Sequence, residues 1–216
     1  MVLEDGLRLI VLAAGASRRM GRDKALLEWG KRWKLITVIM MRYSGERIAQ
    51  RVIVANPDNA DAIRETVQRE LVPWVAISGG RVHADFEVVV NPDPTGPMLA
   101  SIKLGITAMK PGEGPYCIQP VDAFAVTPPL IDFLHETWRL EPQYIHQPAC
   151  DGRGAHPVVI PERFAKEILT LPADGRLDVF LHQHAEMVRK HDWLERELLW
   201  NLNTPEDYKR FRPEMD

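Results

Sequence analysis

Residues 7–27 read Leu-Arg-Leu-Ile-Val-Leu-Ala-Ala-Gly-Ala-Ser-Arg-Arg-Met-Gly-Arg-Asp-Lys-Ala-Leu-Leu, and this stretch decides the fold. From Leu7 to Ala14 the run is nearly continuously apolar, a pattern typical of a strand that other elements cover on both faces. Gly15 ends the run, and the loop after it carries Arg18, Arg19, Arg22 and Lys24. Because ligands bind beyond the carboxyl ends of strands in open α/β sheets, this loop is placed to bind an anion.

The rest of the chain alternates between predicted strands and predicted helices. Apolar segments predict further strands at residues 51–55, 87–91, 116–119, 144–147, 156–160 and 186–191. Helices are expected at residues 57–71, after a cap at Thr127, and after Thr204, where Asp207 holds the capping-box position. This alternation predicts a three-layer α/β/α Rossmann-like fold with a mostly parallel sheet. We expect a single domain that spans residues 1–216.

Composition and charge are those of an ordinary globular protein. Of the 216 residues, 45% are hydrophobic and 26% are charged. Cys117 and Cys150 are too few for a disulfide framework, so we expect reduced, buried thiols and a cytoplasmic location. A net charge of −3 argues against nucleic acid as a partner. The short apolar run near the N-terminus predicts neither a signal peptide nor a membrane span. Oligomeric state is not encoded in these patterns.

The basic loop is suited to a triphosphate. Small residues let backbone amides approach an anion, and long cationic side chains can then surround it. Four charge-assisted hydrogen bonds of about 1.5–3 kcal/mol each would, after losses, hold a nucleotide near micromolar affinity. No lysine directly follows Gly21, so this is not a Walker A loop, and the chain has no Gly-x-Gly-x-x-Gly fingerprint. The alternative is a solvated basic loop without a ligand.

An aspartate after a buried strand is the candidate for binding a metal ion. Asp122 ends the segment Tyr-Cys-Ile-Gln-Pro-Val-Asp, where a carboxylate is costly to desolvate unless a partner neutralises it. Mg²⁺ is usually held by one or two carboxylates together with phosphate oxygens. Asn201 and Asn203 form a second candidate, because two residues apart in a strand they would share a face. A helix N-cap at Asp122 and a turn-forming pair at the asparagines are the structural alternatives.

Four segments of the chain resemble one family. Residues 12–24 match Leu-Ala-Ala-Gly-x-Ser-x-Arg-Met-Gly-x-x-Lys, the opening signature of the MobA/MocA-like nucleotidyltransferases, which attach GMP or CMP to molybdopterin. Residues 91–105 are similar to the family's loop and helix near the base and the α-phosphate. Residues 152–158 resemble the Gly-x-x-Gly-His-Pro segment of the MocA-like branch, and residues 201–207 resemble the closing motif Asn-x-Asn-Thr-Pro-Glu-Asp.

The resemblance implies a role for each matched residue. Arg19, Lys24 and Asp122 would be catalytic, with Arg19 and Lys24 on the β- and α-phosphates and Asp122 on a Mg²⁺ ion. Asn203 would be a second metal ligand. The nucleotide would lie against Leu12, Ala13, Ala14, Gly15, Ser17, Gly96 and Ser101. His156 would orient the acceptor phosphate or, as an alternative, only complete the end of a strand.

The implied reaction is attack by a phosphate oxygen of a small-molecule acceptor on the α-phosphorus of an NTP, with release of pyrophosphate. The opening motif and His156 favour CTP, whereas Gly96 and the Asn-Leu-Asn-Thr-Pro segment favour GTP, which leaves CTP slightly ahead. Molybdopterin is the implied acceptor, and a sugar or alcohol phosphate is the alternative. Phe124 stands where relatives carry proline, and Trp33 begins a pair that replaces Pro-Leu. These departures, together with Asn201, keep open a non-catalytic, nucleotide-binding regulatory protein.

Overall fold

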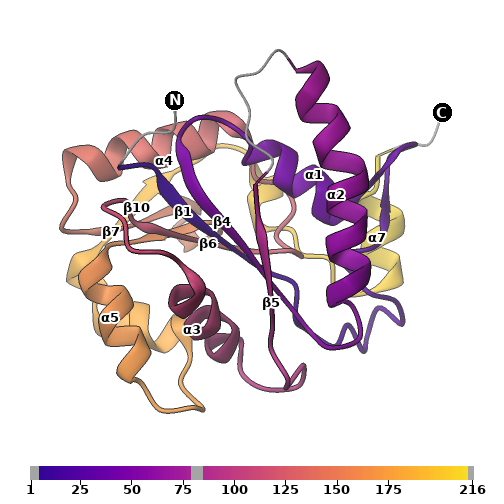
Figure 1. Cartoon of the computed structure of the whole chain (residues 1–216). Helices are drawn as coiled ribbons and strands as arrows, with labels where there is room; N and C mark the ends of the chain where they lie inside the picture. Colours follow the sequence, from indigo (N-terminus) through magenta and orange to yellow (C-terminus); the bar gives the residue numbers. More distant parts are fainter. Residues whose placement is uncertain (1–4, 79–84, 214–216) are drawn as a thin grey trace.

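The computed structural model describes residues 5–78 and 85–213. At its centre is a mixed sheet with the strand order β10-β7-β9-β6-β1-β4-β5, and β8 pairs with β7 (Figure 1). β1 (Leu7–Leu12) lies between β4 (Ile48–Ala55) and β6 (Tyr116–Pro120) and is parallel to both. The remaining strands of the sheet are β5 (Glu87–Val90), β7 (Ile145–Cys150), β8 (Arg153–Gly154), β9 (Val158–Ile160) and β10 (Val188–Asp192).

The sheet is mostly parallel, as predicted, but β8 and β9 run against their neighbours. β9 is antiparallel to both β6 and β7, and β8 is antiparallel to β7. The reason lies in the connection, because only residues 151–157 separate β7 from β9. A parallel return needs a crossover of a dozen or more residues, usually with a helix, whereas an antiparallel return needs only a short turn.

Helices cover both faces of the sheet (Figure 1). α1 (Leu35–Arg42), α2 (Ala60–Ile77) and α4 (Pro128–Leu140) pack in one core, and α3 (Met98–Ala108), α5 (Glu162–Thr170) and α6 (Leu177–Gln183) pack in the other. Side chains of β1 alternate between the two cores, because Leu9 and Val11 belong to the first and Ile10 and Leu12 to the second. The expected three-layer α/β/α fold is therefore confirmed.

The predicted helix signals are confirmed in part. α7 (Pro205–Phe211) begins with the expected capping box, in which Thr204 and Asp207 exchange hydrogen bonds with each other's backbone. Thr127 takes the N-cap position of α4 as predicted, but its side chain makes no capping hydrogen bond. Proline in the first turn of α4 supplies the alternative start, since it has no N–H group that needs a partner.

Trp33 lies in a small hairpin, and Phe124 packs against the same hairpin. β2 (Glu28–Trp29) and β3 (Trp33–Lys34) pair across a turn in which Gly30 has a φ of +71°, a conformation that favours glycine. The ring of Trp29 lies 4.8 Å from that of Phe124, which lies 5.7 Å from that of Phe211. Phe124 therefore joins the hairpin to the C-terminal helix. Short 3₁₀ turns, η1 (Ala185–Met187) and η2 (Arg196–Leu199), complete the described elements.

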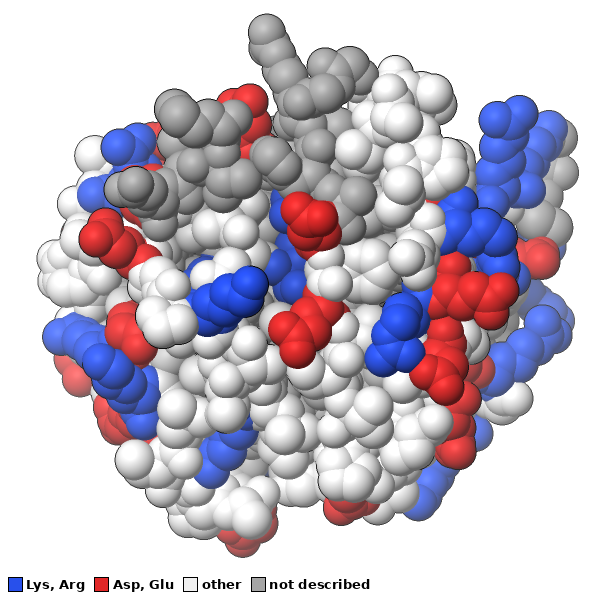
Figure 2. Space-filling view, viewed as in Figure 1, with Lys and Arg blue, Asp and Glu red and all other residues white. Residues whose placement is uncertain are grey.

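The surface and the cysteines agree with the composition. On the described part of the face seen in Figure 2, acidic and basic side chains are interspersed among uncharged ones.

Cys117 and Cys150 are both free and buried, as expected, and burial raises the pKa of the Cys117 thiol to about 12. Within residues 5–78 and 85–213, no helix is both long enough and apolar enough to cross a membrane.

Candidate active site

The candidate site lies at the edge of the sheet where β1, β4 and β6 end. The amide of Ala13 donates to Val54 O at 2.8 Å, and the amide of Val121 donates to Leu12 O at 3.0 Å. The amide of Asn91, directly after β5, donates to Ala55 O at 2.8 Å. Ladder-like bonds therefore continue beyond the strands and fix the loops that follow them side by side.

The basic loop after β1 is folded around Ser17. This residue has a φ of +48°, and its carbonyl accepts hydrogen bonds from the amides of Met20 and Gly21. Its hydroxyl oxygen accepts a 3.3 Å hydrogen bond from the amide of Lys24. Ser17 therefore holds both ends of this loop together and fixes the backbone at Lys24. The position from which the lysine side chain extends thus depends on Ser17.

Four of the predicted residues meet in one polar cluster. Lys24 Nζ lies 2.9 Å from Asp122 Oδ2 and 3.1 Å from Asn203 Oδ1. Arg19 Nη2 donates to the same oxygen of Asn203 at 3.1 Å. The Lys24 and Asp122 side chains are only 14% and 29% exposed, so their attraction is less screened than at an open surface. Residues from three distant parts of the chain therefore share one small volume.

The C-terminal segment is held against the site by backbone bonds. The amide of Leu202 donates to Asp122 O at 3.1 Å, and the Asp207 carboxylate accepts from the amides of Asn203 and Thr204 at 2.9 Å. These hydrogen bonds, led by the one from Asn203, hold the pKa of Asp207 below its usual value. The capping box of α7 is therefore also the support of Asn203.

The predicted pairing of Asn201 with Asn203 on one strand face is wrong. No strand forms there, and the buried side chain of Leu202 separates the two asparagines. Asn201 is exposed and its side-chain amide donates to Leu199 O, whereas Asn203 faces Lys24 and Arg19. The burial of Leu202 in the core decides which asparagine reaches the site.

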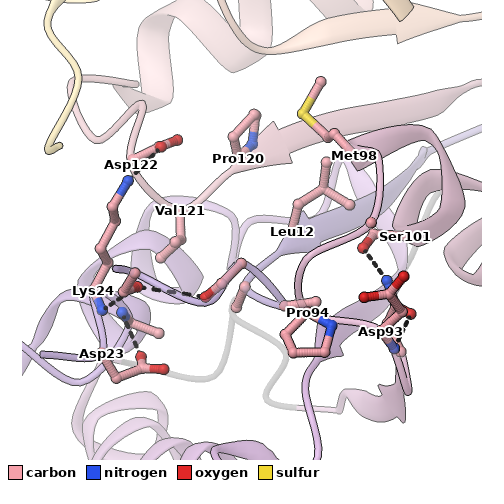
Figure 3. A pocket seen from close by; sticks show the side chains of 17 residues that line it. Leu12, Asp23, Lys24, Asp93, Pro94, Met98, Ser101, Pro120, Val121 and Asp122 are labelled. Carbon is pink, nitrogen blue, oxygen red and sulfur yellow. Dashed lines mark hydrogen bonds and ion pairs between the residues drawn. The ribbon is translucent and has the colours of Figure 1, made fainter. Parts of the chain in front are cut away.

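Two adjoining cavities are lined by every residue predicted for nucleotide and metal binding except Asn201. Figure 3 shows the first of them. The first has a volume of about 210 Å³ and is lined, among others, by Leu12, Ala13, Ala14, Gly15, Ser17, Lys24, Gly96, Ser101 and Asp122. The second, of about 350 Å³, is lined by Ala16, Ser17, Arg18, Arg19, Lys24, Pro94, Thr95 and Asn203. Lys24 and Ser17 border both. A cleft lined by both apolar and polar residues, beside a cationic one, suits a molecule with a ring system and an anionic tail.

A buried network beneath the first cavity was not predicted from the sequence. Asn59 Nδ2 donates to Ala13 O at 3.0 Å and to Asp23 Oδ2 at 2.6 Å, and Asn56 Nδ2 donates to Ala14 O at 3.3 Å. Asp23 Oδ1 accepts from the amides that follow Lys24, and burial raises the pKa of the Asp23 carboxyl. The asparagines follow β4 directly, at the same edge as the other polar groups, and this position was the missed signal.

The opposite wall of the first cavity is also held by side-chain hydrogen bonds. Asn91 Nδ2 donates to Ser101 Oγ at 2.9 Å, and Asp93 Oδ1 accepts from the amide and hydroxyl of Thr95. These bonds, the Thr95 hydroxyl first, lower the pKa of the Asp93 carboxyl. A Cβ atom at Gly96 would lie 2.8 Å from Asp93 Oδ2, so glycine permits the close approach of this turn.

His156 lies near the cluster but is not part of it. Its ring Nδ1 is buried without a hydrogen-bond partner, and burial lowers the pKa of the imidazole. The nearby Asp122 opposes this shift. His156 therefore lies near Asp122, just before β9, and lines neither cavity.

The oxygen donors in the cluster fit a magnesium ion. One carboxylate oxygen and one amide carbonyl oxygen converge on a single cation, here the Lys24 ammonium. Mg²⁺ prefers oxygen ligands and usually takes few of them from protein, with the rest from phosphate and water. Among the described residues, no group of three or more His, Cys, Asp or Glu side chains could hold a metal ion by itself. The two protein oxygens therefore suit an ion that takes its remaining ligands from a phosphate and water.

Comparisons with known proteins give the family and the fold. A family model described as MobA-like NTP transferase domain matches residues 9–188, most of the chain. Among curated proteins, no significant sequence match was found.

Solved structures with the same fold cover nearly the whole chain. Rv0371c from Mycobacterium tuberculosis has a TM-score of 0.74 at 21% identity and covers 97% of this chain and 100% of its own. Its complex with manganese has a TM-score of 0.68 at 19% identity and covers 96% and 98%. Mth528, a nucleotidyl transferase from Methanothermobacter, has a TM-score of 0.73 at 18% identity and covers 96% of both chains. A CMP:2-keto-3-deoxy-manno-octonic acid synthetase complexed with CTP has a TM-score of 0.71 at 11% identity and covers 96% and 97%.

Proposed function

This chain belongs to the family of MobA-like NTP transferase domains and is a nucleotidyltransferase, and from that premise we propose that it transfers a nucleoside monophosphate from an NTP to a phosphorylated small molecule with the help of Mg²⁺. CTP is the favoured donor and molybdopterin the favoured acceptor. One observation carries the proposal: Lys24 Nζ contacts both Asp122 and Asn203 where the cleft of the glycine-rich loop meets the cationic cavity.

The nucleotide would extend across the two cavities. Its base and ribose would lie in the first cavity, against the backbone of Ala13, Ala14 and Gly15 and beside Gly96 and Ser101. Its phosphates would enter the second, where Arg19 and Lys24 donate charge-assisted hydrogen bonds to the leaving pyrophosphate. Ser17 borders both cavities and is therefore at the level of the α-phosphate.

Asp122 and Asn203 would hold the metal ion. When bound, Mg²⁺ polarises the α-phosphate and neutralises charge that develops during phosphoryl transfer. Manganese in the structure of Rv0371c supports a divalent ion for this fold. The protein itself would orient the nucleotide and supply cationic side chains, and positioning of this kind accounts for most catalysis in phosphoryl transfer.

Sequence motifs and the comparisons support a choice of base and acceptor. The opening Leu-Ala-Ala-Gly motif favours CTP, and the CTP-bound synthetase with the same fold makes CTP the first nucleotide to test. GTP is the second. The family match and the segment around His156 support molybdopterin as acceptor. A sugar or alcohol phosphate would need the same Lys24, Asp122 and Asn203 arrangement, so only substrate tests distinguish these acceptors.

Pyrophosphate release measures the proposed reaction directly. The purified chain is incubated with Mg²⁺ and with CTP, GTP, ATP or UTP in turn, each against molybdopterin, a sugar phosphate and an alcohol phosphate. We expect release with CTP and molybdopterin, and loss of that release after chelation with EDTA. Asp132→Ala is a matched control for variants of Asp122, because Asp132 lies on α4, pairs with Arg47 and lines neither cavity. If every pair fails while the wild-type chain still binds NTP, the proposed reaction is wrong.

A further inference from the structure

The Lys24 ammonium group takes the two oxygen atoms that the proposed function assigns to the metal ion. It lies 2.9 Å from Asp122 Oδ2 and 3.1 Å from Asn203 Oδ1. We propose that Lys24 competes with the divalent ion for these two oxygens, so that the metal site opens only when a nucleotide's phosphates draw the ammonium group away. This inference rests on the proposed function, because it takes Asp122 and Asn203 as the metal ligands.

The hydrogen-bond capacity of the cluster supports direct competition. Asn203 Oδ1 accepts from both Lys24 Nζ and Arg19 Nη2, each at 3.1 Å, and a carbonyl oxygen has two lone pairs. Both are therefore in use. A magnesium ion needs its oxygen ligands at about 2.0–2.1 Å, so it would lie in contact with the ammonium group and be repelled by it. Asp122 and Asn203 can bind one cation or the other at a time.

The backbone of the loop lets the lysine side chain move while its own position stays fixed. The Lys24 amide is bound to Ser17 Oγ, and the amides of Ala25 and Leu26 are bound to the buried carboxylate of Asp23. Only the flexible four-carbon stem of Lys24 is left to rotate. It borders both cavities, so its ammonium group can turn from Asp122 toward the cationic cavity without a change of fold.

Charge balance makes the exchange depend on nucleotide. If Lys24 left without a replacement, the partly buried Asp122 carboxylate would lose its cationic partner, which is unfavourable. If a nucleotide's phosphates receive the ammonium group, the lysine keeps an anionic partner and Asp122 is free for the divalent ion. Nucleotide and metal therefore favour each other's binding through Lys24, and such coupling is reciprocal by thermodynamic linkage.

The consequence can be measured without substrate. In the absence of nucleotide, the wild-type chain should bind divalent metal weakly, because the ion must displace Lys24. Removal of the ammonium group with little change in side-chain length should strengthen metal binding. Loss of a residue that helps to bind the metal would weaken metal binding, so an increase in affinity distinguishes competition from an ordinary binding role.

The test is a titration of Mn²⁺ into the full chain without nucleotide, followed by the electron paramagnetic resonance signal of free Mn²⁺. Lys24→Met and Lys24→Gln should each bind Mn²⁺ at least about tenfold more tightly than the wild type, since each frees two charge-assisted contacts. Two variants are used so that the result does not depend on the folding of one, and thermal unfolding is recorded for both.

Two further variants separate competition from general charge repulsion. Arg19→Met removes a cation that touches Asn203 but has no contact with Asp122, and Lys31→Met removes an exposed cation from the β2–β3 turn. Both should change Mn²⁺ affinity by less than about threefold, because Lys24 still occupies both metal ligands in Arg19→Met and the charge of the exposed Lys31 is screened. Adding Asp122→Asn to Lys24→Met should abolish the gain.

Three results would overturn the proposal. They are an unchanged or weaker Mn²⁺ affinity in both Lys24 variants, an equal gain in Arg19→Met or Lys31→Met, and a gain that survives Asp122→Asn. None involves NTP or acceptor, so the titration can fail while pyrophosphate release succeeds. The reverse result, a Lys24-dependent gain without any transfer activity, would retain the competition and reject the proposed reaction.

Discussion

The two ends of β1 each hold a cation paired with a carboxylate, and the pairs differ in their surroundings. At the amino end, Arg8 is 2% exposed, pairs with Glu162, donates to Gly114 O at 2.7 Å and donates to Tyr116 Oη at 3.0 Å. Near the carboxyl end, Lys24 is 14% exposed and contacts Asp122 and a neutral asparagine.

The difference lies in what each cation faces. The Arg8 guanidinium lies 3.8 Å from the centre of the Tyr116 ring, and it is surrounded by protein groups that hydrogen-bond to it. Lys24 borders two cavities, so a ligand can take the place of its partners. A buried ion pair is therefore weak grounds for assigning function, whereas a pair at the wall of a cavity supports such an assignment. We expect the amino-end pair to affect stability and the carboxyl-end pair to affect activity.

Asp122→Ala should give the largest effect. Removing the carboxylate should lower kcat/KM by about a thousandfold, or about 4 kcal/mol, because metal binding and neutralisation are both lost. The melting temperature should change little, since the backbone bond from Leu202 to Asp122 O remains possible. Pyrophosphate release and thermal unfolding together measure this. If Asp122→Ala kept its activity, or if it unfolded, the carboxyl-end pair would not differ from the amino-end pair in the way we expect.

Arg8→Ala should reverse that pattern. Loss of the buried guanidinium leaves Gly114 O without a donor and should reduce the free energy of unfolding by about 3 kcal/mol. The folded fraction should keep the wild-type kcat/KM. Urea unfolding gives the stability, with Arg64→Ala as control, because the exposed Arg64–Asp61 pair should contribute less than about 1 kcal/mol. An unchanged stability would contradict a structural role for Arg8.

Lys24→Ala should lower kcat/KM by about a hundredfold, with KM for the NTP raised and kcat reduced. The reason is that Lys24 contacts phosphate both when the nucleotide binds and when pyrophosphate leaves. Steady-state kinetics at saturating acceptor measure both constants. If neither constant moves, the basic loop has been misassigned.

Asn59→Ala tests the buried support of the site. Its amide holds Ala13 O and the Asp23 carboxylate, so its loss should raise KM for the NTP by about threefold to tenfold through a displaced loop. The kcat should fall less than KM rises. Asn59→Asp keeps the acceptor oxygen that binds the Asn56 amide but places a second carboxylate against Asp23, so it should raise KM at least as much as alanine does. Wild-type kinetics in both variants would show that the loop holds its position unaided.

Asp23→Asn should give the smallest change, seen in the pH dependence of stability. Burial raises the pKa of Asp23 in the folded protein above its ordinary value of 3.8. A raised carboxyl pKa means that the folded state binds the proton more tightly, so stability from this group falls as pH rises through the folded pKa. Urea unfolding between about pH 4 and pH 6 should show that this decline is absent in the variant. An unchanged slope would show that Asp23 does not titrate in this range.

Local sequence patterns predicted the centre of the fold and the residues that gather at its edge. The apolar run before Gly15 marks β1, and strands in a parallel sheet end at a common edge. That rule was enough to predict that Lys24 and Asp122 lie at the same edge of the sheet, although they are 98 residues apart in the sequence. The capping box of α7 was also predicted, because its bonds join residues three apart.

Features that depend on tertiary packing could not be predicted. Asn203 faces the site and Asn201 does not because Leu202 is buried between them, and burial is set by the whole core. Asn59 supports Ala13 from the turn between β4 and α2, a contact that depends on how β1 and β4 pair in the sheet. β9 is antiparallel because its connection to β7 is short. The sequence shows the length of that connection, but it does not show that β9 pairs with β6 and β7.

The bond between Lys24 and Asn203 spans 179 residues of sequence. During synthesis, the glycine-rich loop and Asp122 leave the ribosome well before the segment that carries Asn203. A nascent chain that ends before residue 203 can form most of the sheet, but its phosphate pocket still lacks one wall. Contacts so distant in sequence are among the slowest to form, so the capacity to bind substrate should appear late in folding.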